Sequence, residues 1–494
     1  MGKAAGKQFF PVRSRHQAID GLPASLRRHR NKPPDSPNAT YLIVPTLRKE
    51  AAMPTTISAS MLRRATIASV LGNALEWFDF VSYGSFSVLI ARTLFPPADL
   101  TVSILLGFAT LGISFIVRPI GGLVFGIYAD RYGRKKALSF IFGLMAIGTL
   151  MIAVVPTYSV IGISASLMLI LARVIQGFSS GGEFASATAT LIEFAPKERR
   201  GLYGSLQMVS QILATVLASV CVVVLTKLLP ENALAAWGWR LPFLFGALIG
   251  PIGLYMRHNL TESPEFQAEI ARLGRPPSAP LRRVLEQHRL ELVASFCLVA
   301  AITGPSYISS VYLPELAINK LGMTSIDATL PVLLAACLMI VLVPLSAWWS
   351  DRLSRIGVIG FGLVAFSVTY PFLFARFVAS PTFPSMLQLQ LGAGIFYAFA
   401  VGPAAAQITE IFPVGVRSTG VSSTYNLAVM LFGGMAPFTL TLFSGQPYGP
   451  AFYTVGLSLL GLIGLRCLSV LKRRSAEEHN SLEHDVIVKS ESRY

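Results

Sequence analysis

Three carboxyl groups interrupt apolar stretches in the first half of the chain, where an ionisable side chain is costly and therefore usually functional. Glu76, Asp79 and Tyr83 follow an i, i+3, i+7 pattern, so a helix would carry all three on one face. Glu183 lies in a later apolar stretch. Because a partly buried carboxyl group can exchange a proton near neutral pH, we predict that Glu76, Asp79 and Glu183 couple the protein to protons.

Two arginines lie in the same apolar surroundings. Arg118 interrupts one stretch, and Arg173 begins a polar stripe that continues through Gln176 to Glu183. The guanidinium group is a planar fork of fixed positive charge that suits a carboxylate. We therefore predict that Arg118 and Arg173 bind a substrate anion, with Gln176 and Tyr83 as further substrate-binding residues.

Two structural explanations stay open for these charges. Glu183 could form an ion pair with Arg118 or Arg173 that only locks helices together, since structural networks also bury charges. Alternatively, the first helix begins late and leaves Glu76 and Asp79 near an aqueous face. The apolar run that precedes Glu76 favours burial over this second explanation.

The elements that must position these residues are long apolar runs. The sequence is 53% hydrophobic and only 13% charged, whereas soluble domains carry about 25% charged residues. Runs of about 20 apolar residues cross a bilayer as helices. We expect an all-α integral membrane protein with twelve transmembrane helices in two groups of six, at 65–91, 101–127, 137–156, 160–192, 203–228, 241–257, 291–313, 328–349, 356–378, 385–410, 420–443 and 450–470.

Basic residues gather in alternate loops between these runs. The clusters lie at 131–136, 197–200, 272–289, 352–355 and 472–474, and the intervening loops hold few. Such alternation is the positive-inside pattern, which places both termini in the cytoplasm. It accounts for the net charge of +16 without a nucleic-acid partner.

Two short motifs occur once in each half of the chain. A charged turn at 126–136 follows the second run, and a weaker copy at 350–355 follows the eighth. After the fourth and tenth runs, Glu193 and Glu410 are each followed by a proline three residues later and an arginine seven residues later. Because the copies fall on the same side of the membrane, they indicate a parallel repeat of six helices.

The second half offers neutral polar groups in place of charges. Its predicted helix interiors hold no acid or base at mid-depth, but they include Tyr307, Tyr425 and Asn426. We predict that the first half handles protons and charge, and that these three residues help to bind the substrate.

The segments outside the runs are hydrophilic. We expect a disordered basic extension at 1–60 and hypothesise that translation starts at Met53. The remaining predicted divisions are a six-helix bundle at 61–257, a cytoplasmic linker at 258–290, a second bundle at 291–470 and a disordered cytoplasmic tail at 471–494.

Motifs for other functional classes are missing from the sequence. There is no HExxH, GxSxG or Walker sequence and no histidine cluster, which argues against a membrane enzyme, a metal site or an ATP-driven pump. The linker and tails are too short for the output domain of a sensor.

The turn Gly126-x-x-Ala-Asp130-Arg131-x-Gly133-Arg134-Lys135 resembles the signature loop of the major facilitator superfamily. Further segments resemble its metabolite:proton symporter group, which includes citrate, α-ketoglutarate, shikimate and proline/betaine carriers. These segments are 72–84, 118–122, 173–184, 237–243 and 417–420, and the resemblance covers about residues 64–470.

The resemblance implies the major facilitator fold, with two pseudo-symmetric six-helix bundles around a central cavity, alternating access and proton-coupled uptake. It also implies a cytoplasmic gate, whose matching residues are Asp130, Arg131, Arg134, Glu193, Arg200, Glu410 and Arg417. In the second copy of the turn, Ser354 replaces the expected glycine. We therefore expect Asp351 and Arg352 only to anchor the topology.

The substrate that this resemblance favours is a small organic acid such as citrate, in agreement with two interior arginines. Uptake of proline, betaine or shikimate, and efflux by the same fold, stay open as alternatives. We expect no cofactor beyond the proton gradient, no metal, and a monomer embedded in the lipid of a bacterial inner membrane.

Overall fold

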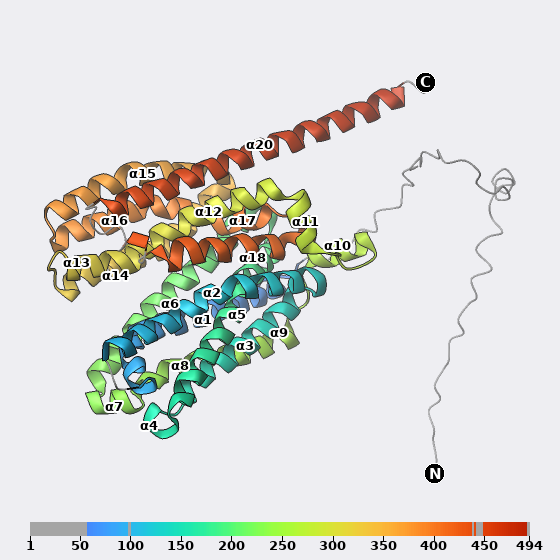
Figure 1. The fold of residues 1–494 in the computed structure, drawn as a ribbon. Coiled ribbons are helices and arrows are strands. Elements are labelled where there is room, and N and C mark those ends of the chain that lie inside the picture. Colours follow the sequence, from blue (N-terminus) through green and yellow to red (C-terminus); the bar gives the residue numbers. More distant parts are fainter. Residues whose placement is uncertain (1–56, 97–99, 437–438, 441–447, 492–494) are drawn as a thin grey trace, which may run out of the picture. The chain divides into compact units, whose positions relative to one another are not determined.

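The computed structural model describes residues 57–96, 100–436, 439–440 and 448–491, and the elements assigned in these ranges are all helical (Figure 1). Most of the predicted N-terminal extension, including Met53, lies outside these ranges. The first described helix is α1, whose first turn is capped by Ser58 through a hydrogen bond from the Met61 N–H (3.2 Å).

The first half places helices over all six of its predicted runs. They are α1 (Ala59–Leu94), α2 (Leu100–Tyr132), α3 (Arg134–Val154), α5 (Ile163–Phe194), α6 (Arg200–Leu228) and the pair α8 (Leu241–Gly246) and α9 (Ile249–Asn259). Two short helices, α4 (Tyr158–Ile161) and α7 (Glu231–Ala236), lie in connections. Predicted and observed boundaries differ by at most about two turns.

The second half also places helices over its six runs. They are α12 (Arg289–Tyr307) with η4 (Ile308–Tyr312) and α13 (Leu313–Asn319), α14 (Ser325–Arg352), α15 (Arg355–Ala379), α16 (Phe383–Val401) with α17 (Ala404–Glu410), α18 (Arg417–Ala428) with η6 (Val429–Gly434), and α20 (Gly449–Glu491). Pro305 and Pro403 lie where α12 and α16 give way to the next segment, because proline lacks the N–H that a continuous helix needs.

The segment between the halves forms two short helices, α10 (Pro264–Leu273) and α11 (Pro280–Gln287). Ser263 caps α10 by accepting a hydrogen bond from the Phe266 N–H (3.1 Å), and proline occupies the first position of both helices.

The last helix is longer than its apolar run. We predicted disorder after Lys472, but α20 continues to Glu491, so this prediction is wrong for that stretch. The sequence from 473 to 491 contains no proline or glycine, and nothing local therefore ends the helix at the predicted membrane face.

Ten helical stretches of the described residues are long and apolar enough to cross a membrane. The two remaining predicted spans are α1, which is 36 residues long and carries Glu76 and Asp79, and α18 with η6. All twelve predicted spans are therefore mainly helical in their described parts, with short turns at 162, 247–248, 402–403 and 435.

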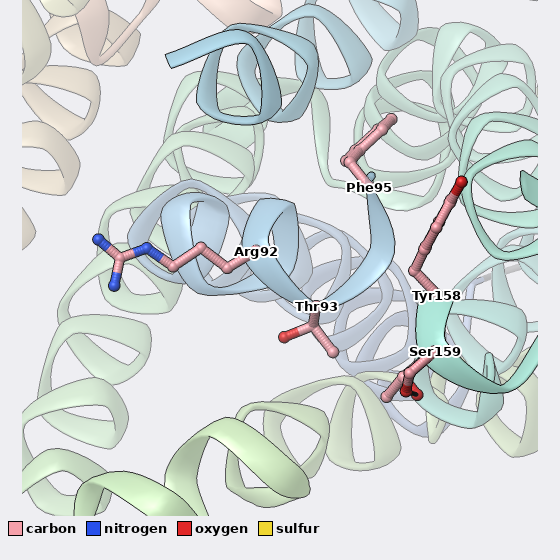
Figure 2. A pocket seen from close by; sticks show the side chains of 6 residues that line it. Arg92, Thr93, Phe95, Tyr158 and Ser159 are labelled. Atoms are coloured by element: carbon pink, nitrogen blue, oxygen red, sulfur yellow. Dashed lines mark hydrogen bonds between the residues drawn. The ribbon is translucent and has the colours of Figure 1, made fainter. Parts of the chain in front are cut away.

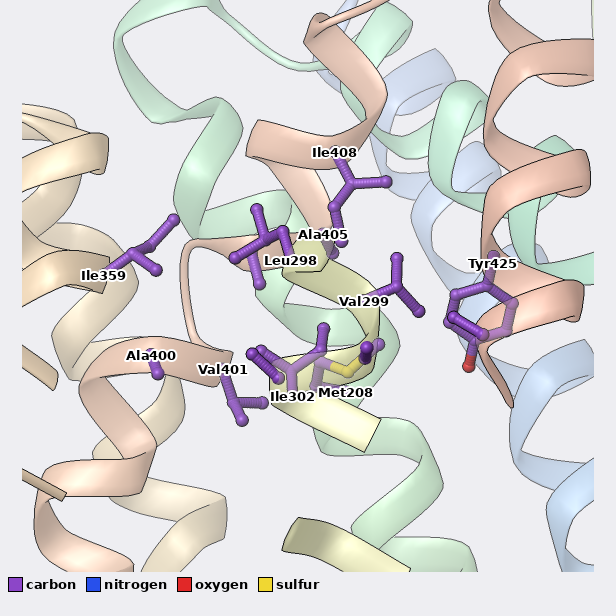
Figure 3. Packing of buried hydrophobic residues seen from close by; sticks show 14 of the residues in the cluster. Met208, Leu298, Val299, Ile302, Ile359, Ala400, Val401, Ala405, Ile408 and Tyr425 are labelled. Carbon is purple, nitrogen blue, oxygen red and sulfur yellow. The ribbon is translucent and has the colours of Figure 1, made fainter. Parts of the chain in front are cut away.

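The two halves meet mainly along α2 with α18 and α6 with α14, and α5 with α18 and α6 with α17 add to the interface. The first pair packs closely, since a Cβ on Gly126 would lie 2.9 Å from the Ser418 carbonyl oxygen. An apolar cluster also bridges the halves. Figure 3 shows Met208 of α6 lying among Leu298, Val299 and Ile302 of α12.

Candidate functional site

Five charged residues gather inside the first half, and we refer to them as the central cluster: Glu76 and Asp79 of α1, Arg118 of α2, and Arg173 and Glu183 of α5. Each is at most 4% exposed. Since α1 begins at Ala59, Glu76 lies roughly 25 Å along the helix at 1.5 Å per residue. The alternative in which α1 begins late and leaves its acids near an aqueous face is therefore wrong.

Glu76 forms an ion pair with Arg118. The Arg118 Nε also donates a hydrogen bond to Ser180 Oγ (2.8 Å). The guanidinium carbon lies 4.9 Å from the ring centre of Phe80 and 5.5 Å from that of Phe115. One carboxylate and two aromatic faces thus hold the arginine in place of water.

Asp79 forms the second pair, with Arg173 (3.6 Å). Gln176 supports it, because its Nε2 donates to Asp79 Oδ2 (2.7 Å) and its Oε1 accepts from Arg173 Nη1 (2.8 Å). The Arg173 guanidinium lies 3.3 Å from the ring centre of Tyr83, whose hydroxyl is hydrogen bonded to Thr110. Arg173 Nε and Nη2 make no hydrogen bond to any described residue, which leaves donors for a ligand.

Glu183 differs from the other two acids, because no arginine forms an ion pair with it within the described residues. The structural pairing considered from the sequence, Glu183 with Arg118 or Arg173, is therefore wrong. Its carboxyl group instead lies within hydrogen-bonding reach of Glu76. Two carboxyl groups can share such a bond only if one carries a proton, and the proton then belongs to the pair.

The predicted residues of the second half approach this region from the opposite side. The Tyr307 ring lies 6.1 Å from Phe115, and its hydroxyl makes no hydrogen bond to a described residue. Tyr425 stacks on Phe184 with ring centres 3.6 Å apart. Asn426 is occupied differently, since its Nδ2 donates to the Gly181 carbonyl (2.6 Å) and so connects α18 to α5.

A second cluster of charges closes one end of the interface between the halves, and we refer to it as the gate cluster: Asp130, Arg134, Glu193, Arg200, Glu265, Asp351, Arg355, Glu410 and Arg417. Asp130 accepts hydrogen bonds from the N–H groups of Ser418 (3.0 Å) and Thr419 (2.8 Å) at the start of α18. A carboxylate is favoured there because a helix N-terminus exposes unpaired N–H groups and a positive dipole end.

Asp351 repeats this contact in the second half. It accepts hydrogen bonds from the N–H groups of Gly201 (2.8 Å) and Leu202 (2.9 Å) at the start of α6. Our expectation that Asp351 only anchors the topology is therefore wrong. Gly133 has a φ of 104°, which favours glycine, whereas Ser354 has a φ of −147°, so the second turn works without glycine.

Ion pairs connect the two copies of the gate. Arg134 pairs with Glu193 (3.1 Å), and Arg355 pairs with Glu410. Each acid also receives the arginine of the other half: Arg417 lies 2.8 Å from Glu193, and Arg200 lies 3.1 Å from Glu410. Separating the two halves at this end therefore requires the Arg417–Glu193 and Arg200–Glu410 ion pairs to break.

Arg131, a predicted gate residue, and Arg352, its counterpart in the second turn, lie outside the gate cluster. Arg131 is exposed, and its guanidinium lies 5.9 Å from the ring centre of Tyr132. Arg352 is likewise exposed and lies 3.8 Å from the ring centre of Trp348. The structure thus separates both residues from the gate cluster, although each follows a gate aspartate directly in the sequence.

The linker adds contacts that we did not predict. Glu265 of α10 forms ion pairs with both Arg200 and Arg417 (2.8 Å to the latter). Glu262 accepts a hydrogen bond from the Arg134 N–H (2.9 Å) at the start of α3, and burial raises the pKa of Glu262. The acids follow the last span of the first half closely, but their partners lie far away in sequence, so spacing alone could not reveal them.

Other neighbours of the central cluster were also not predicted from the sequence. Thr149 of α3 accepts a hydrogen bond from Gln176 Nε2 (2.8 Å), and Phe80 and Phe115 flank Arg118. A threonine or phenylalanine within an apolar run gives no signal of its own, because such residues are common in helix interiors.

A separate depression lies beside the end of α1 and the short helix α4 (Figure 2). Its volume is about 340 Å³, and Arg92, Thr93 and Phe95 at the end of α1 line it together with Tyr158 and Ser159 of α4. It contains no residue of the central cluster.

Comparison with known proteins identifies similar chains. A family model described as "Sugar (and other) transporter" matches residues 64–275, and one described as "Major Facilitator Superfamily" matches residues 296–490. A citrate-proton symporter of Klebsiella pneumoniae is 35% identical over 412 residues, which cover 82% of this chain and 90% of that protein. A putative proline/betaine transporter of Staphylococcus aureus (strain MSSA476) is 33% identical over 417 residues, covering 82% and 88%.

Solved structures resemble the fold at lower identity. A proton:xylose symporter bound to a bromo-deoxyglucose aligns with a TM-score of 0.69 and 17% identity, covering 82% of this chain and 94% of that chain. A human organic anion transporter aligns with a TM-score of 0.57 and 18% identity, covering 82% and 99%. At these identities the likeness concerns the arrangement of helices.

Proposed function

Because this chain belongs to the major facilitator superfamily and is a multi-pass membrane transporter, we propose that it moves a small carboxylate-bearing solute together with protons by alternating access. The observation that carries the proposal is the central cluster itself. Three buried acids face only two buried arginines, so the cluster has one negative charge more than it can pair internally. A proton is the simplest group that removes this excess.

The ionised Glu76 carboxylate and the substrate carboxylate would compete for the same arginine. While Glu76 is ionised, it occupies Arg118. A proton shared between Glu76 and Glu183 weakens that ion pair and leaves the Arg118 fork available to a substrate carboxylate. Protonation therefore favours substrate binding, and substrate binding favours protonation, as thermodynamic linkage requires.

Arg173 offers a second point of attachment. Its unpaired Nε and Nη2 can donate to a carboxylate while Nη1 remains with Gln176. Asp79 and Gln176 would hold the fork in position, and Tyr83 would cover its other face. Tyr307, with an unpaired hydroxyl, would complete the site from the second half.

The gate cluster would control access from one side, which we propose is the cytoplasm. The basic clusters at 131–136, 197–200 and 272–289 all lie at the gate end, as the positive-inside rule requires of a cytoplasmic face. The first residue of α1 and the extended C-terminal part of α20 would then lie on the cytoplasmic side. We further propose a monomer in the inner membrane, driven by the proton gradient without a cofactor.

Small organic acids are the first candidate substrates, since two arginines face the site and a citrate-proton symporter is among the similar proteins. A zwitterion such as proline or glycine betaine is the second candidate. The rings of Phe80 and Phe115 already bind a cationic side chain, and aromatic faces of this kind also attract a quaternary ammonium group.

Uptake into proteoliposomes tests the proposal. Purified protein is offered labelled citrate, α-ketoglutarate, proline and glycine betaine, with and without an inward proton gradient. We expect one of the two classes to accumulate only with the gradient, and a protonophore to abolish accumulation. Accumulation that a protonophore leaves unchanged would contradict proton coupling.

Arginine variants test the site itself. Arg118→Lys and Arg173→Lys keep the charge but lose the planar fork, so we expect uptake to fall by about tenfold or more while the protein remains folded by thermal melting. The matched control is Arg376→Lys, because Arg376 is exposed in the last turn of α15. Normal uptake by both cluster variants would show that the site lies elsewhere.

A further inference from the structure

A line of polar side chains runs along α1 from the gate end toward the central cluster. Thr66, Ser69 and Asn73 precede Glu76 at spacings that place all four on one face of the helix. Ser69 and Asn73 are fully buried, whereas Arg63, one turn before Thr66, is exposed. The line therefore connects the aqueous gate end to a buried carboxyl group.

The polar atoms along this line lack partners among the described residues. They include Thr66 Oγ1, Ser69 Oγ and Asn73 Oδ1. Hydroxyl groups farther along the same helix behave differently, since Ser85 and Thr93 donate to the carbonyls of Val81 and Leu89. Buried polar atoms are nearly always hydrogen bonded, and internal water commonly supplies the missing partner.

Helix α6 provides the facing wall of this line. Asn73 Nδ2 donates to the Gln207 carbonyl oxygen (3.0 Å) and to Ser210 Oγ (2.5 Å). The Gln207 side chain is fully buried, and its amide group lies within hydrogen-bonding reach of Glu183. Polar groups with unused hydrogen-bonding capacity thus extend from Thr66 on one helix to Gln207, beside Glu183, on another.

We propose that internal waters occupy this line and form a proton route between the gate end and the Glu76–Glu183 pair. The route lies inside the first bundle, between α1, α5 and α6, and so differs from the substrate path between the bundles. It deepens the proposed function and depends on it, since a proton route serves only a proton-coupled carrier. Two charged neighbours surround the pair: Arg118 of α2 faces both acids, and Asp79 of α1 interacts with Glu76.

Asn73 is positioned to close the route while the gate is shut. Its amide group bonds α6 at two points and separates the Ser69 end of the line from Glu76. Helix α6 is in turn held by Asp351 of the other bundle through its first N–H groups. Opening the gate releases α6 from Asp351, which lets α6 move away from Asn73 and connects the waters.

Radiolytic hydroxyl labelling of the full-length protein in detergent, read by peptide mass spectrometry, tests for the water directly. Internal water generates radicals beside buried side chains, so we expect label on the fully buried Ser69, Asn73 and Gln207, assigned by fragment mass apart from their exposed neighbours. The control is the fully buried side chain of Phe243, for which we expect no label. Absence of label from Ser69, Asn73 and Gln207 would overturn the proposal.

Transport by variants tests the route. Ser69→Val and Gln207→Leu fill it with apolar atoms. Ser69 Oγ has no partner among the described residues and Gln207 loses its contact with Glu183, so we expect both variants to fold. Proton-driven uptake of citrate or glycine betaine should fall about tenfold, and exchange of labelled for unlabelled solute, which needs no net proton movement, should persist. Ser85→Val on the same helix is the control and should retain both activities.

The outcomes separate the two proposals. Normal proton-driven uptake by Ser69→Val and Gln207→Leu would overturn the route alone, as would the loss of exchange together with uptake. Wild-type uptake that ignores the proton gradient would instead contradict the proposed function. Asn73→Ala gives a second measurement: we expect a proton leak without substrate, detected by a dye inside the vesicles, and a tight membrane would contradict the role of Asn73 as the closure.

Discussion

Among the buried acids of the central cluster, Glu183 is the one whose charge has no arginine to balance it. Glu76 and Asp79 each face a guanidinium group, whereas Glu183 faces Glu76. Taking an unpaired carboxylate out of water costs several kcal/mol, and in the proposed function a proton shared with Glu76 would remove this cost. We therefore expect deprotonation of Glu183 to change substrate binding more than deprotonation of the other two acids does.

Glu183→Gln fixes this side chain in a neutral form of the same shape. We expect the variant to exchange labelled for unlabelled solute at close to the wild-type rate but to lose accumulation against a gradient, because the proton no longer enters and leaves. Exchange and accumulation are measured in the same proteoliposomes. Accumulation as strong as that of the wild type would assign the coupling to Asp79 instead.

The sequence predicted which residues of the central cluster share a helix face but not which ones pair. The i, i+3, i+7 spacing placed Glu76, Asp79 and Tyr83 inward, and all three are buried. The choice between Arg118 and Arg173 as partners depends on the relative heights and rotations of three helices. Packing fixes those quantities, and no local pattern in the chain records them.

At the scale of elements, the gate works through helix ends. Asp130 and Asp351 each cap the first N–H groups of a helix in the opposite half. Around them, Glu193 and Glu410 each form ion pairs with one arginine from each half. Glu265 of α10 joins the network from the linker and contacts one arginine from each half. The short helix α10 therefore stabilises the closed gate although it crosses no membrane.

Removing the charge of Glu265 should loosen the gate. Glu265→Gln weakens two charge-assisted hydrogen bonds, and we expect a cysteine introduced at the buried Ser422 to react about tenfold faster with a thiol reagent, measured by peptide mass. Glu269→Gln on the same helix is the control, because among the described residues Glu269 forms its ion pair with the exposed Arg272. Equal labelling rates in the two variants would show that α10 does not stabilise the closed gate.

The cap that Glu262 provides to α3 predicts a pH dependence. Burial raises the pKa of Glu262 from its ordinary value of 4.5, so the folded state binds this proton more tightly than the unfolded chain does. Its contribution to stability is then present below pH 4.5 and is lost as the pH rises through the raised pKa.

Glu262→Gln should remove that contribution while keeping an acceptor for the α3 N–H groups. We expect the melting temperature of the variant to fall less than that of the wild type as the pH rises from about 4.5 to 7. The measurement is a thermal melt in detergent at several pH values. Identical pH profiles would mean that Glu262 titrates as it does in the unfolded chain.

At the scale of the whole molecule, the repeat is preserved at the gate and lost at the centre. Both halves supply an aspartate cap and a Glu–Arg pair to the gate cluster, but the described helix interiors of the second half add no charge to the central cluster. Such asymmetry suits a carrier in which one bundle holds the proton and the other moves against it.

Most of the helices could be placed from the sequence, because apolar runs of membrane-spanning length leave few alternatives to a helix. The extension of α20 to Glu491 and the docking of α10 on the gate could not. The first follows from the absence of a helix breaker rather than from an apolar signal, and the second joins residues far apart in the chain.

The central claim of the proposed function is that substrate and proton cross the membrane together through the central cluster. In the most direct test, proteoliposomes are loaded with a pH-sensitive dye, and a saturating concentration of citrate or glycine betaine is added to the external medium. No proton gradient is imposed. We predict that the lumen acidifies as the solute enters, and that Glu183→Gln vesicles take up the solute without acidifying. Solute entry into wild-type vesicles with no change in internal pH would contradict the account.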